Sequence, residues 1–177
     1  MDMADLRPLI LIPSYNTGPI LVETVMSALQ LRMPVWIVFD GSTDGSPERV
    51  RPWVSVANPS FRIIDLPKNS GKGAAVLQGL REAISAGFTH VLTMDADGQH
   101  PAEQVPEFLA LSSKHPEAAI FGRPVFDENA PALRVKGRKI SNFWANLETL
   151  GWGVDDSLFG MRLYPAQDLL EVMESTR

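Results

Sequence analysis

Short apolar runs alternate along the chain with longer segments in which apolar residues recur every three or four positions. Five of the short runs are rich in Val, Ile and Leu, which is typical of buried β-strands. They cover residues 9–12, 35–39, 61–66, 90–94 and 118–121. The intervening segments have helical periodicity; in the first of them, Leu21, Val25 and Ala28 would share one face. Pro13 follows the first run directly and is expected to stop that strand.

This alternation of strands and helices predicts an α/β fold with a mostly parallel sheet and helices on both of its faces. The pattern changes after residue 121, where Ile140, Phe143 and Trp144 belong to one helical stripe. A further strand is predicted over residues 160–164, added at an edge of the sheet, and a last helix begins at Ala166. Because no repeat, linker or low-complexity tract interrupts the chain, residues 1–177 are expected to form a single domain.

Polar, glycine-rich sequences follow each of the five predicted strands. They are PSYNT, DGSTDGS, KNSGKG, DADGQH and GRP. In parallel sheets of this class the ligand crevice lies beyond the carboxyl ends of the strands, where all five sequences would meet. The sequence therefore predicts a binding site at that rim.

Composition narrows the classes of protein that fit. The 177 residues include 16 Lys plus Arg and 21 Asp plus Glu, a formal charge of −5 that argues against a general nucleic-acid binder. The absence of cysteine excludes disulfides, thiolate metal ligands and a cysteine nucleophile. Every apolar run is far shorter than the roughly 20 residues that cross a bilayer, and the acidic N-terminus does not resemble a signal peptide. These features predict a cytoplasmic protein.

Asp95 and Asp97 stand two positions apart at the end of a predicted strand, so their side chains emerge on one face. Two convergent carboxylates suit a hard divalent cation such as Mg²⁺ or Mn²⁺, with Gln99 or His100 available as a third ligand. The alternative is that one aspartate caps the following helix while the other is solvated.

Two further loops have both a chemical and a structural interpretation. Asp40 could accept a hydrogen bond from a ribose hydroxyl or a base, although turn chemistry alone also explains the DGSTDG sequence. Asn69, Gly71 and Lys72 precede a predicted helix, whose free N–H groups attract anions. Their spacing matches neither a Walker loop nor a complete dinucleotide fingerprint, so glycines placed for close packing are the alternative.

A basic segment separates the fifth strand from the helix that carries Trp144. It contains Arg123, Arg134, Lys136, Arg138 and Lys139. Such a run is ordinarily solvated, but opposite an acidic metal site it would neutralise a diphosphate or attract an anionic acceptor. Asp155 and Asp156 are candidates for a general base, or for turn caps.

Five motifs in order resemble the family 2 glycosyltransferases, in particular the branch that includes dolichol-phosphate mannose synthase and polyprenyl-phosphate glycosyltransferases. The motifs are LILIPSYNT, VFDGSTDGS, NSGKGAAVLQGL, LTMDADGQHPAE and DSLFGMRLYP, and the resemblance spans about residues 8–165. It implies a GT-A fold and an inverting, metal-dependent enzyme. Such an enzyme moves a sugar from a nucleoside diphosphate sugar to a polyprenyl phosphate or to a glycan or lipid hydroxyl.

The resemblance also implies roles for individual residues. Tyr15 would lie near the base and Asp40 on the base or ribose, within a nucleotide-binding set of Pro13, Tyr15, Asn16, Val38, Asp40, Lys72, Asp95 and Ala96. The metal would be held by Asp95, Asp97 and Gln99. Arg123 and Arg138 would face phosphates or the acceptor, and Asp156 would act as base or acceptor-site carboxylate, so that Asp97 and Asp156 are the catalytic pair.

Three departures from the family pattern qualify the resemblance. Phe39 replaces the first Asp of the usual Asp-Asp-Gly-Ser, and Thr17 replaces the Glu of Tyr-Asn-Glu. The chain also ends twelve residues after Pro165, where the family normally continues, so a shortened acceptor site is expected. A lipid acceptor would be reached from the cytoplasmic surface, through the basic segment with Phe143 or Trp144, although a place in the core is the more ordinary interpretation of these two aromatic residues.

Two other functions compete with sugar transfer. A non-catalytic nucleotide-sugar-binding domain would have the same donor motifs. A phosphatase of the haloacid dehalogenase type also uses Asp-x-Asp-Gly after a strand, but its nucleophile sits on the first strand, whereas Asp95 follows the fourth. The phosphatase is therefore the weaker alternative.

Overall fold

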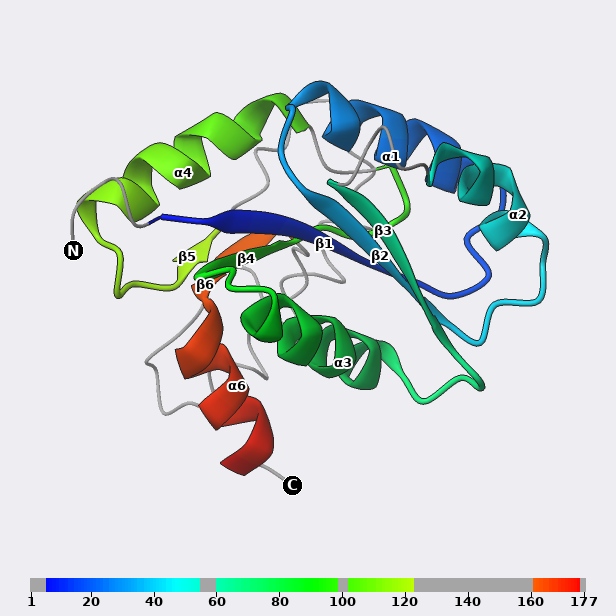
Figure 1. Ribbon diagram of the computed structural model, residues 1–177. Helices are drawn as coiled ribbons and strands as arrows, with labels where there is room; N and C mark the ends of the chain where they lie inside the picture. Colours follow the sequence, from blue (N-terminus) through cyan, green and yellow to red (C-terminus); the bar gives the residue numbers. More distant parts are fainter. Residues whose placement is uncertain (1–5, 55–59, 99–101, 123–160, 176–177) are drawn as a thin grey trace, which may run out of the picture.

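One six-stranded sheet organises the computed structural model, which describes residues 6–54, 60–98, 102–122 and 161–175. The strand order is β3-β2-β1-β4-β6-β5 (Figure 1). The strands are β1 Pro8–Ser14, β2 Val35–Asp40, β3 Phe61–Leu66, β4 His90–Thr93, β5 Ile120–Phe121 and β6 Arg162–Pro165. The first four strands are parallel, and β6 runs antiparallel to both β4 and β5. The predicted mostly parallel α/β sheet is confirmed.

Helices cover both faces of the sheet (Figure 1). The helices are α1 Ile20–Gln30, α2 Ser46–Val50, α3 Lys72–Ser85, α4 Val105–Lys114 and α6 Ala166–Ser175, with short 3₁₀ turns η2 Arg51–Trp53 and η3 Ala102–Gln104. α1, α2 and α4 lie on one face, and α3 and α6 lie on the other. In the described ranges, no helix combines the length and the apolar composition that a membrane span needs.

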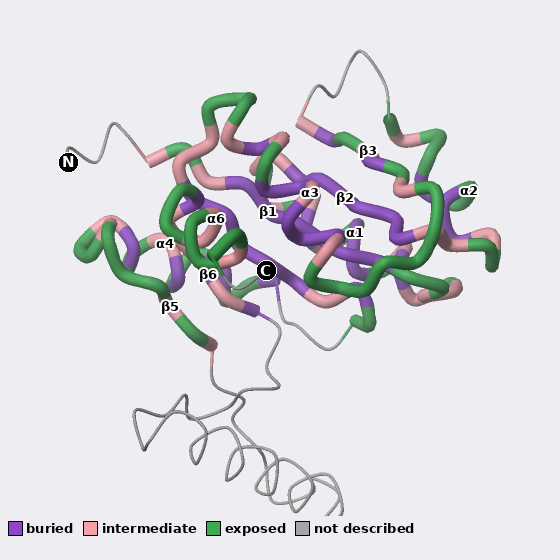
Figure 2. The backbone as a smooth tube through the Cα atoms, turned by 90° about the horizontal axis from the view of Figure 1, so that it is seen from below, coloured by how far each residue is buried: buried purple, intermediate pink, exposed green. Residues whose placement is uncertain are grey.

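The central strands are apolar throughout because both of their faces are covered. In β1, Ile10 and Ile12 point into the core under α1, whereas Leu9 and Leu11 point into the core over α3. β2 alternates in the same way, and nearly every residue of these two strands is buried (Figure 2). This double burial explains why the sequence shows continuous runs instead of alternation.

Pro13 does not stop the first strand, contrary to the prediction. β1 continues through Pro13 to Ser14, and Pro13 pairs in register with Val38. The Ile10 N–H donates to the carbonyl of Pro34, next to β2, so the backbone N–H and C=O groups of even-numbered residues in β1 point toward β2. Those of odd-numbered residues point toward β4; the Leu11 carbonyl, for example, accepts the N–H of Met94. Pairing with β4 ends at Leu11, so Pro13 has no ladder bond to lose.

The strand predicted at an edge is also placed differently. β6 lies inside the sheet, between β4 and β5, and its Leu163 is fully buried opposite Leu92. The edge position belongs to β5, which is reduced to two residues. Periodicity shows that a strand forms but not which neighbours it pairs with, which is why the placement was wrong. The helical stripe around Trp144 lies outside the described residues.

Candidate active site

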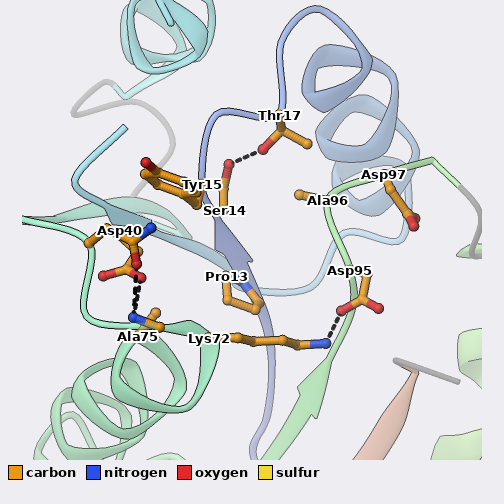
Figure 3. A pocket seen from close by; sticks show the side chains of 12 residues that line it. Pro13, Ser14, Tyr15, Thr17, Asp40, Lys72, Ala75, Asp95, Ala96 and Asp97 are labelled. Carbon is orange, nitrogen blue, oxygen red and sulfur yellow. Dashed lines mark hydrogen bonds and ion pairs between the residues drawn. The ribbon is translucent and has the colours of Figure 1, made fainter. Parts of the chain in front are cut away.

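The loops that follow β1, β2, β3 and β4 surround one pocket at the carboxyl ends of the strands, as the sequence predicts. Its volume is about 430 Å³. It is lined by Pro13, Ser14, Tyr15, Thr17, Asp40, Asn69, Gly71, Lys72, Ala75, Asp95, Ala96 and Asp97. Figure 3 shows Tyr15 and Asp40 at one end of the pocket, with Asp95 and Asp97 at the other. The pocket thus has an aromatic end and an acidic end.

The acidic end is formed by the loop after β4. The Lys72 ammonium, at the start of α3, forms an ion pair with the Asp95 carboxylate (Figure 3). The loop turns at Gly98 with φ +72°, where an added Cβ would lie 2.9 Å from Cγ1 of Ile20. Among the described residues no three His, Cys, Asp or Glu side chains group as metal ligands, so any cation here would rest on the two aspartates with ligands from elsewhere.

Asp40 ties the end of β2 to the start of α3. Its carboxylate is only 2% exposed, and its two oxygens accept the N–H groups of Ser70 and Gly71, each at 2.8 Å. The two backbones approach so closely that a Cβ on Gly41 would lie 2.5 Å from the Asn69 nitrogen. Asp40 therefore lines the pocket and also fixes the loop from which Lys72 emerges.

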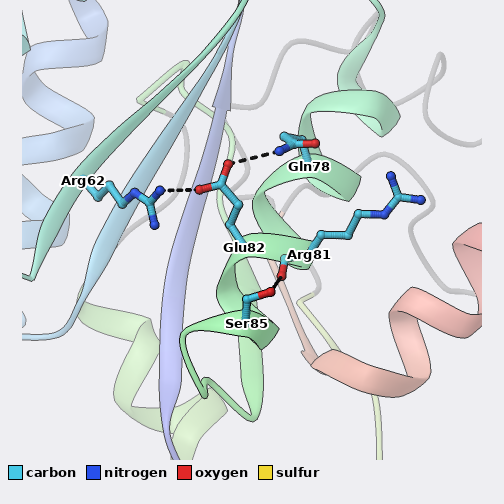
Figure 4. A network of polar contacts seen from close by, with 5 residues as sticks. All are labelled: Arg62, Gln78, Arg81, Glu82 and Ser85. Carbon is cyan, nitrogen blue, oxygen red and sulfur yellow. Dashed lines mark hydrogen bonds and ion pairs between the residues drawn. The ribbon is translucent and has the colours of Figure 1, made fainter.

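Glu82 anchors α3 further along its length. It forms an ion pair with Arg62 of β3 and accepts a hydrogen bond from Nε2 of Gln78 at 3.0 Å (Figure 4). The Arg62 guanidinium in turn lies 4.7 Å from the centre of the Trp36 ring. Because α3 is tied to the sheet at both places, the position of Lys72 follows from the packing of the whole helix.

The loop after β1 carries the aromatic end. Tyr15 is 50% exposed, and its neighbour Asn16 adopts a left-handed conformation with φ 48°. The Asn16 side chain accepts the N–H of Thr43 at 2.8 Å, and the Asn16 N–H donates to the Ser42 hydroxyl at 3.1 Å. The loops after β1 and β2 are thus bonded to each other beside the pocket.

Asp44 completes this connection from the β2 side. One carboxylate oxygen accepts the N–H of Gly18 at 2.7 Å; the other accepts the Ser46 hydroxyl at 2.6 Å and the Ser46 N–H at 3.0 Å. The Ser46 hydroxyl lowers the pKa of Asp44 below its ordinary value; partial burial opposes this, and the backbone N–H groups of Ser46 and Gly18 add to it. Asp44 is therefore charged at neutral pH.

The structure brings most of the predicted site residues together. Those that line the pocket are Pro13, Tyr15, Asp40, Lys72, Asp95, Ala96 and Asp97. Asn16 supports the loop beside it. Val38 does not line the pocket: its side chain is fully buried and packs toward Gly79 of α3, and its role in nucleotide binding stays a prediction. Gln99, Arg123, Arg138 and Asp156 lie outside the described residues.

Sequence reasoning missed part of the lining. Ser14, Thr17 and Ala75 line the pocket although nothing in their chemistry singles them out. Asp44 was explained by turn chemistry, and its bond to Gly18 joins positions 26 residues apart. The sequence did contain a signal for Asp44: the loop DGSTDGS has two aspartates, and one turn needs only one of them.

Comparison with known proteins agrees with this geometry. The model of the family described as glycosyl transferase family 2 matches residues 9–170, which is most of the chain. The chain belongs to glycosyl transferase family 2. The resemblance based on the five motifs is therefore confirmed.

Curated relatives of this family 2 member are named for transfer to polyprenyl phosphates. The polyprenol monophosphomannose synthase of Mycolicibacterium smegmatis is 29% identical over 97% of this chain and 68% of its own length. The undecaprenyl-phosphate mannosyltransferase of Micrococcus luteus is 28% identical over 83% of this chain and 56% of its own. The chain thus spans about half to two thirds of these relatives, and they support the polyprenyl-phosphate branch of the family.

Solved structures agree on the fold. Residues 1–349 of S. aureus TarS in complex with UDP-GlcNAc match with a TM-score of 0.58 and 18% identity, over 94% of this chain and 47% of that one. GalNAc-T7 with UDP, GalNAc and Mn²⁺ matches with a TM-score of 0.60 and 12% identity, over 94% of this chain and 36% of that one. Both are GT-A glycosyltransferases, which confirms the predicted GT-A fold for this family 2 chain.

Proposed function

We propose that this family 2 member transfers a sugar from a nucleoside diphosphate sugar to the phosphate of a polyprenyl lipid, at the cytoplasmic face of a membrane. The observation that carries the donor part is the pocket itself, with its aromatic and acidic ends. The relatives named for polyprenyl-phosphate transfer support the acceptor part. The proposal treats residues 1–177 as one catalytic domain.

The aromatic end fits a nucleoside. The half-exposed Tyr15 ring offers a face on which a base can stack. Asp40 already accepts two N–H groups, but each carboxylate oxygen has two acceptor sites, so it can also accept from a ribose hydroxyl or a base N–H. Pro13 lines the wall between Tyr15 and the acidic end. These contacts would hold the base and ribose of the donor without touching the sugar that is transferred.

The acidic end fits Mg²⁺ or Mn²⁺ by the chemistry of its donors. Asp95 and Asp97 supply carboxylate oxygens, which hard divalent cations prefer. Asp95 already binds one positive group, the Lys72 ammonium. Gln99 is proposed as a further ligand. When bound, the cation would neutralise the charge that develops on the leaving diphosphate. The Mn²⁺ bound by GalNAc-T7 supports this proposal by analogy of fold.

In the proposed reaction, a bond forms between an acceptor oxygen and the anomeric carbon while the bond from that carbon to the diphosphate breaks. Attack from the opposite face inverts the configuration. A lipid phosphate is already ionised, so Asp156 needs only to orient it, with Arg123 and Arg138 attracting its charge. For a hydroxyl acceptor, Asp156 would be the general base. The products are a glycosylated acceptor and a nucleoside diphosphate.

A thermal-shift screen of UDP-, GDP- and TDP-sugars with and without Mn²⁺ tests the donor part. A donor present at about 100 times its Kd stabilises the fold by roughly 2.7 kcal/mol. In a domain of this size that raises the Tm by roughly 5–10 °C. We expect one nucleotide series to do so and Mn²⁺ to enhance the effect. No shift with any donor would contradict the proposal.

Activity assays of the same protein distinguish sugar transfer from the two competing functions. A donor that binds without transfer to a polyprenyl phosphate and without slow hydrolysis would favour a non-catalytic nucleotide-sugar-binding domain. Hydrolysis of simple phosphate monoesters without donor binding would favour the phosphatase.

Lys72 is expected to exchange Asp95 for the donor diphosphate. A charge-assisted hydrogen bond contributes about 1.5–3 kcal/mol, so Lys72→Met should weaken nucleoside diphosphate binding roughly 10- to 100-fold. Binding of the nucleoside alone should not change. Lys68→Met is the matched control, because Lys68 lies on the same loop but does not line the pocket. Isothermal titration calorimetry measures the affinities of the wild type and both variants for the nucleoside and the nucleoside diphosphate. An equal loss for nucleoside and diphosphate would contradict the assignment.

A further inference from the structure

The loop that carries Tyr15 has no packed core of its own and is held largely by bonds to its neighbour. Residues 15–18 follow β1 and include two positive φ angles, at Asn16 and Gly18. The bonds described above join this loop to residues 42–44, which follow β2. The orientation of Tyr15 therefore depends on the loop after β2.

Asp44 has the central position in this connection, although it does not line the pocket. It accepts three hydrogen bonds, one from Gly18 on the far loop and two from Ser46 at the start of α2. Since α2 packs through Val50 into the core, the carboxylate links the Tyr15 loop to a fixed element. Turn chemistry explains the bonds to Ser46 but not the bond to Gly18.

We propose that Asp44 is a positioning residue for donor binding, which holds the loop of residues 15–18 so that the Tyr15 ring forms the wall of the nucleotide end of the pocket. The proposal rests on the proposed function, because it assigns Tyr15 to the base. Asp44 itself touches no substrate. Its effect on the donor is transmitted entirely through Tyr15.

A carboxylate suits this place because each of its two oxygens accepts a backbone N–H group, from Gly18 and from Ser46, and such a group can only donate. An amide in the same place has one acceptor oxygen, and its NH₂ group would face either the Gly18 N–H or the Ser46 donors. Asp44→Asn therefore breaks one side of the connection while it keeps the size of the side chain. The two loops would then be held together mainly by the bonds of Asn16 to Ser42 and Thr43.

A double-mutant cycle on Asp44 and Tyr15 tests the proposal. UDP, GDP and TDP are titrated with Mn²⁺ into the wild-type chain, Asp44→Asn, Tyr15→Ala and the double variant. We expect each single variant to bind the preferred nucleotide about 5- to 30-fold more weakly. The double variant should bind no more weakly than Tyr15→Ala, since residues that act through one contact are not additive.

Asp65→Asn is the matched control. Asp65 is an exposed aspartate whose carboxylate pairs with Arg51, away from the pocket, so its variant should bind like the wild type. Fully additive effects of Asp44→Asn and Tyr15→Ala would overturn the proposal. Equal binding by Asp44→Asn and Asp65→Asn would overturn it as well.

Hydrogen exchange provides a measurement that needs no ligand. Amides of residues 15–18 should exchange faster in Asp44→Asn than in Asp65→Asn, whereas those of β1 should not change. Unchanged exchange would overturn the role of Asp44. If UDP, GDP and TDP all fail to bind the wild type, the proposed function fails, and the exchange result still decides whether Asp44 holds the loop.

Discussion

Asp97→Ala is expected to abolish metal-dependent donor binding. With Asp97 removed, Asp95 is the carboxylate that remains at the acidic end of the pocket within the described ranges, and it already forms an ion pair with Lys72. Loss of groups that merely support metal ligands typically costs 10- to 100-fold, so loss of a proposed ligand should cost at least about 100-fold in Mn²⁺ affinity. Transfer activity should fall by at least as much.

Calorimetry with and without Mn²⁺ measures this effect directly. The wild type should bind its nucleoside diphosphate more tightly with Mn²⁺, and Asp97→Ala should bind it equally in both conditions. Asp168→Ala is the control, because Asp168 is an exposed acid on α6, away from the pocket. A Mn²⁺ enhancement that survives in Asp97→Ala would exclude Asp97 from the metal site.

Gly41→Ala is expected to cause the largest loss of stability among alanine substitutions of the positive-φ glycines. Gly41 has φ +69°, and an added Cβ would lie 2.5 Å from backbone atoms of Lys68 and Asn69. Left-handed strain and overpacking each cost about 1–3 kcal/mol, so the free energy of unfolding should fall by roughly 2–5 kcal/mol. Nucleotide affinity should fall too, because the clash displaces the loop that Asp40 holds.

Gly45→Ala separates the two causes. Gly45 has φ +78° but nothing within 4 Å of its added Cβ, so it has the backbone strain without the clash. Its loss should be smaller, and nucleotide binding should be retained. Urea unfolding gives both free energies. Equal losses in the two variants would show that the close approach at Gly41 contributes nothing.

The sheet could be predicted from the sequence because burial on both faces produces continuous apolar runs. The same signal has no information about neighbours, so the position of β6 between β4 and β5 could not be obtained from it. The end of β1 was misjudged for a local reason, since the effect of Pro13 depends on which strand its missing N–H would face.

The site was predictable where polar residues follow apolar strands directly. Tyr15, Asp40, Asp95 and Asp97 have this position, and all line the pocket. Val38 lies outside the pocket lining because the strand alternation turns its side chain toward α3. The role of Asp44 needs the contact between two loops 26 residues apart, which no local pattern encodes.

The placement of β6 has a consequence for biosynthesis. Within the described residues, β6 is the neighbour through which β5 joins the sheet, and it comes after β5 by some forty positions in the sequence. The sheet of described strands is therefore incomplete until the ribosome has made residues 161–165. Until then, β6 is not available to pair with β4. An open edge of this kind invites pairing with other chains. Nascent chains stalled before residue 161 should accordingly aggregate more readily than chains that include β6.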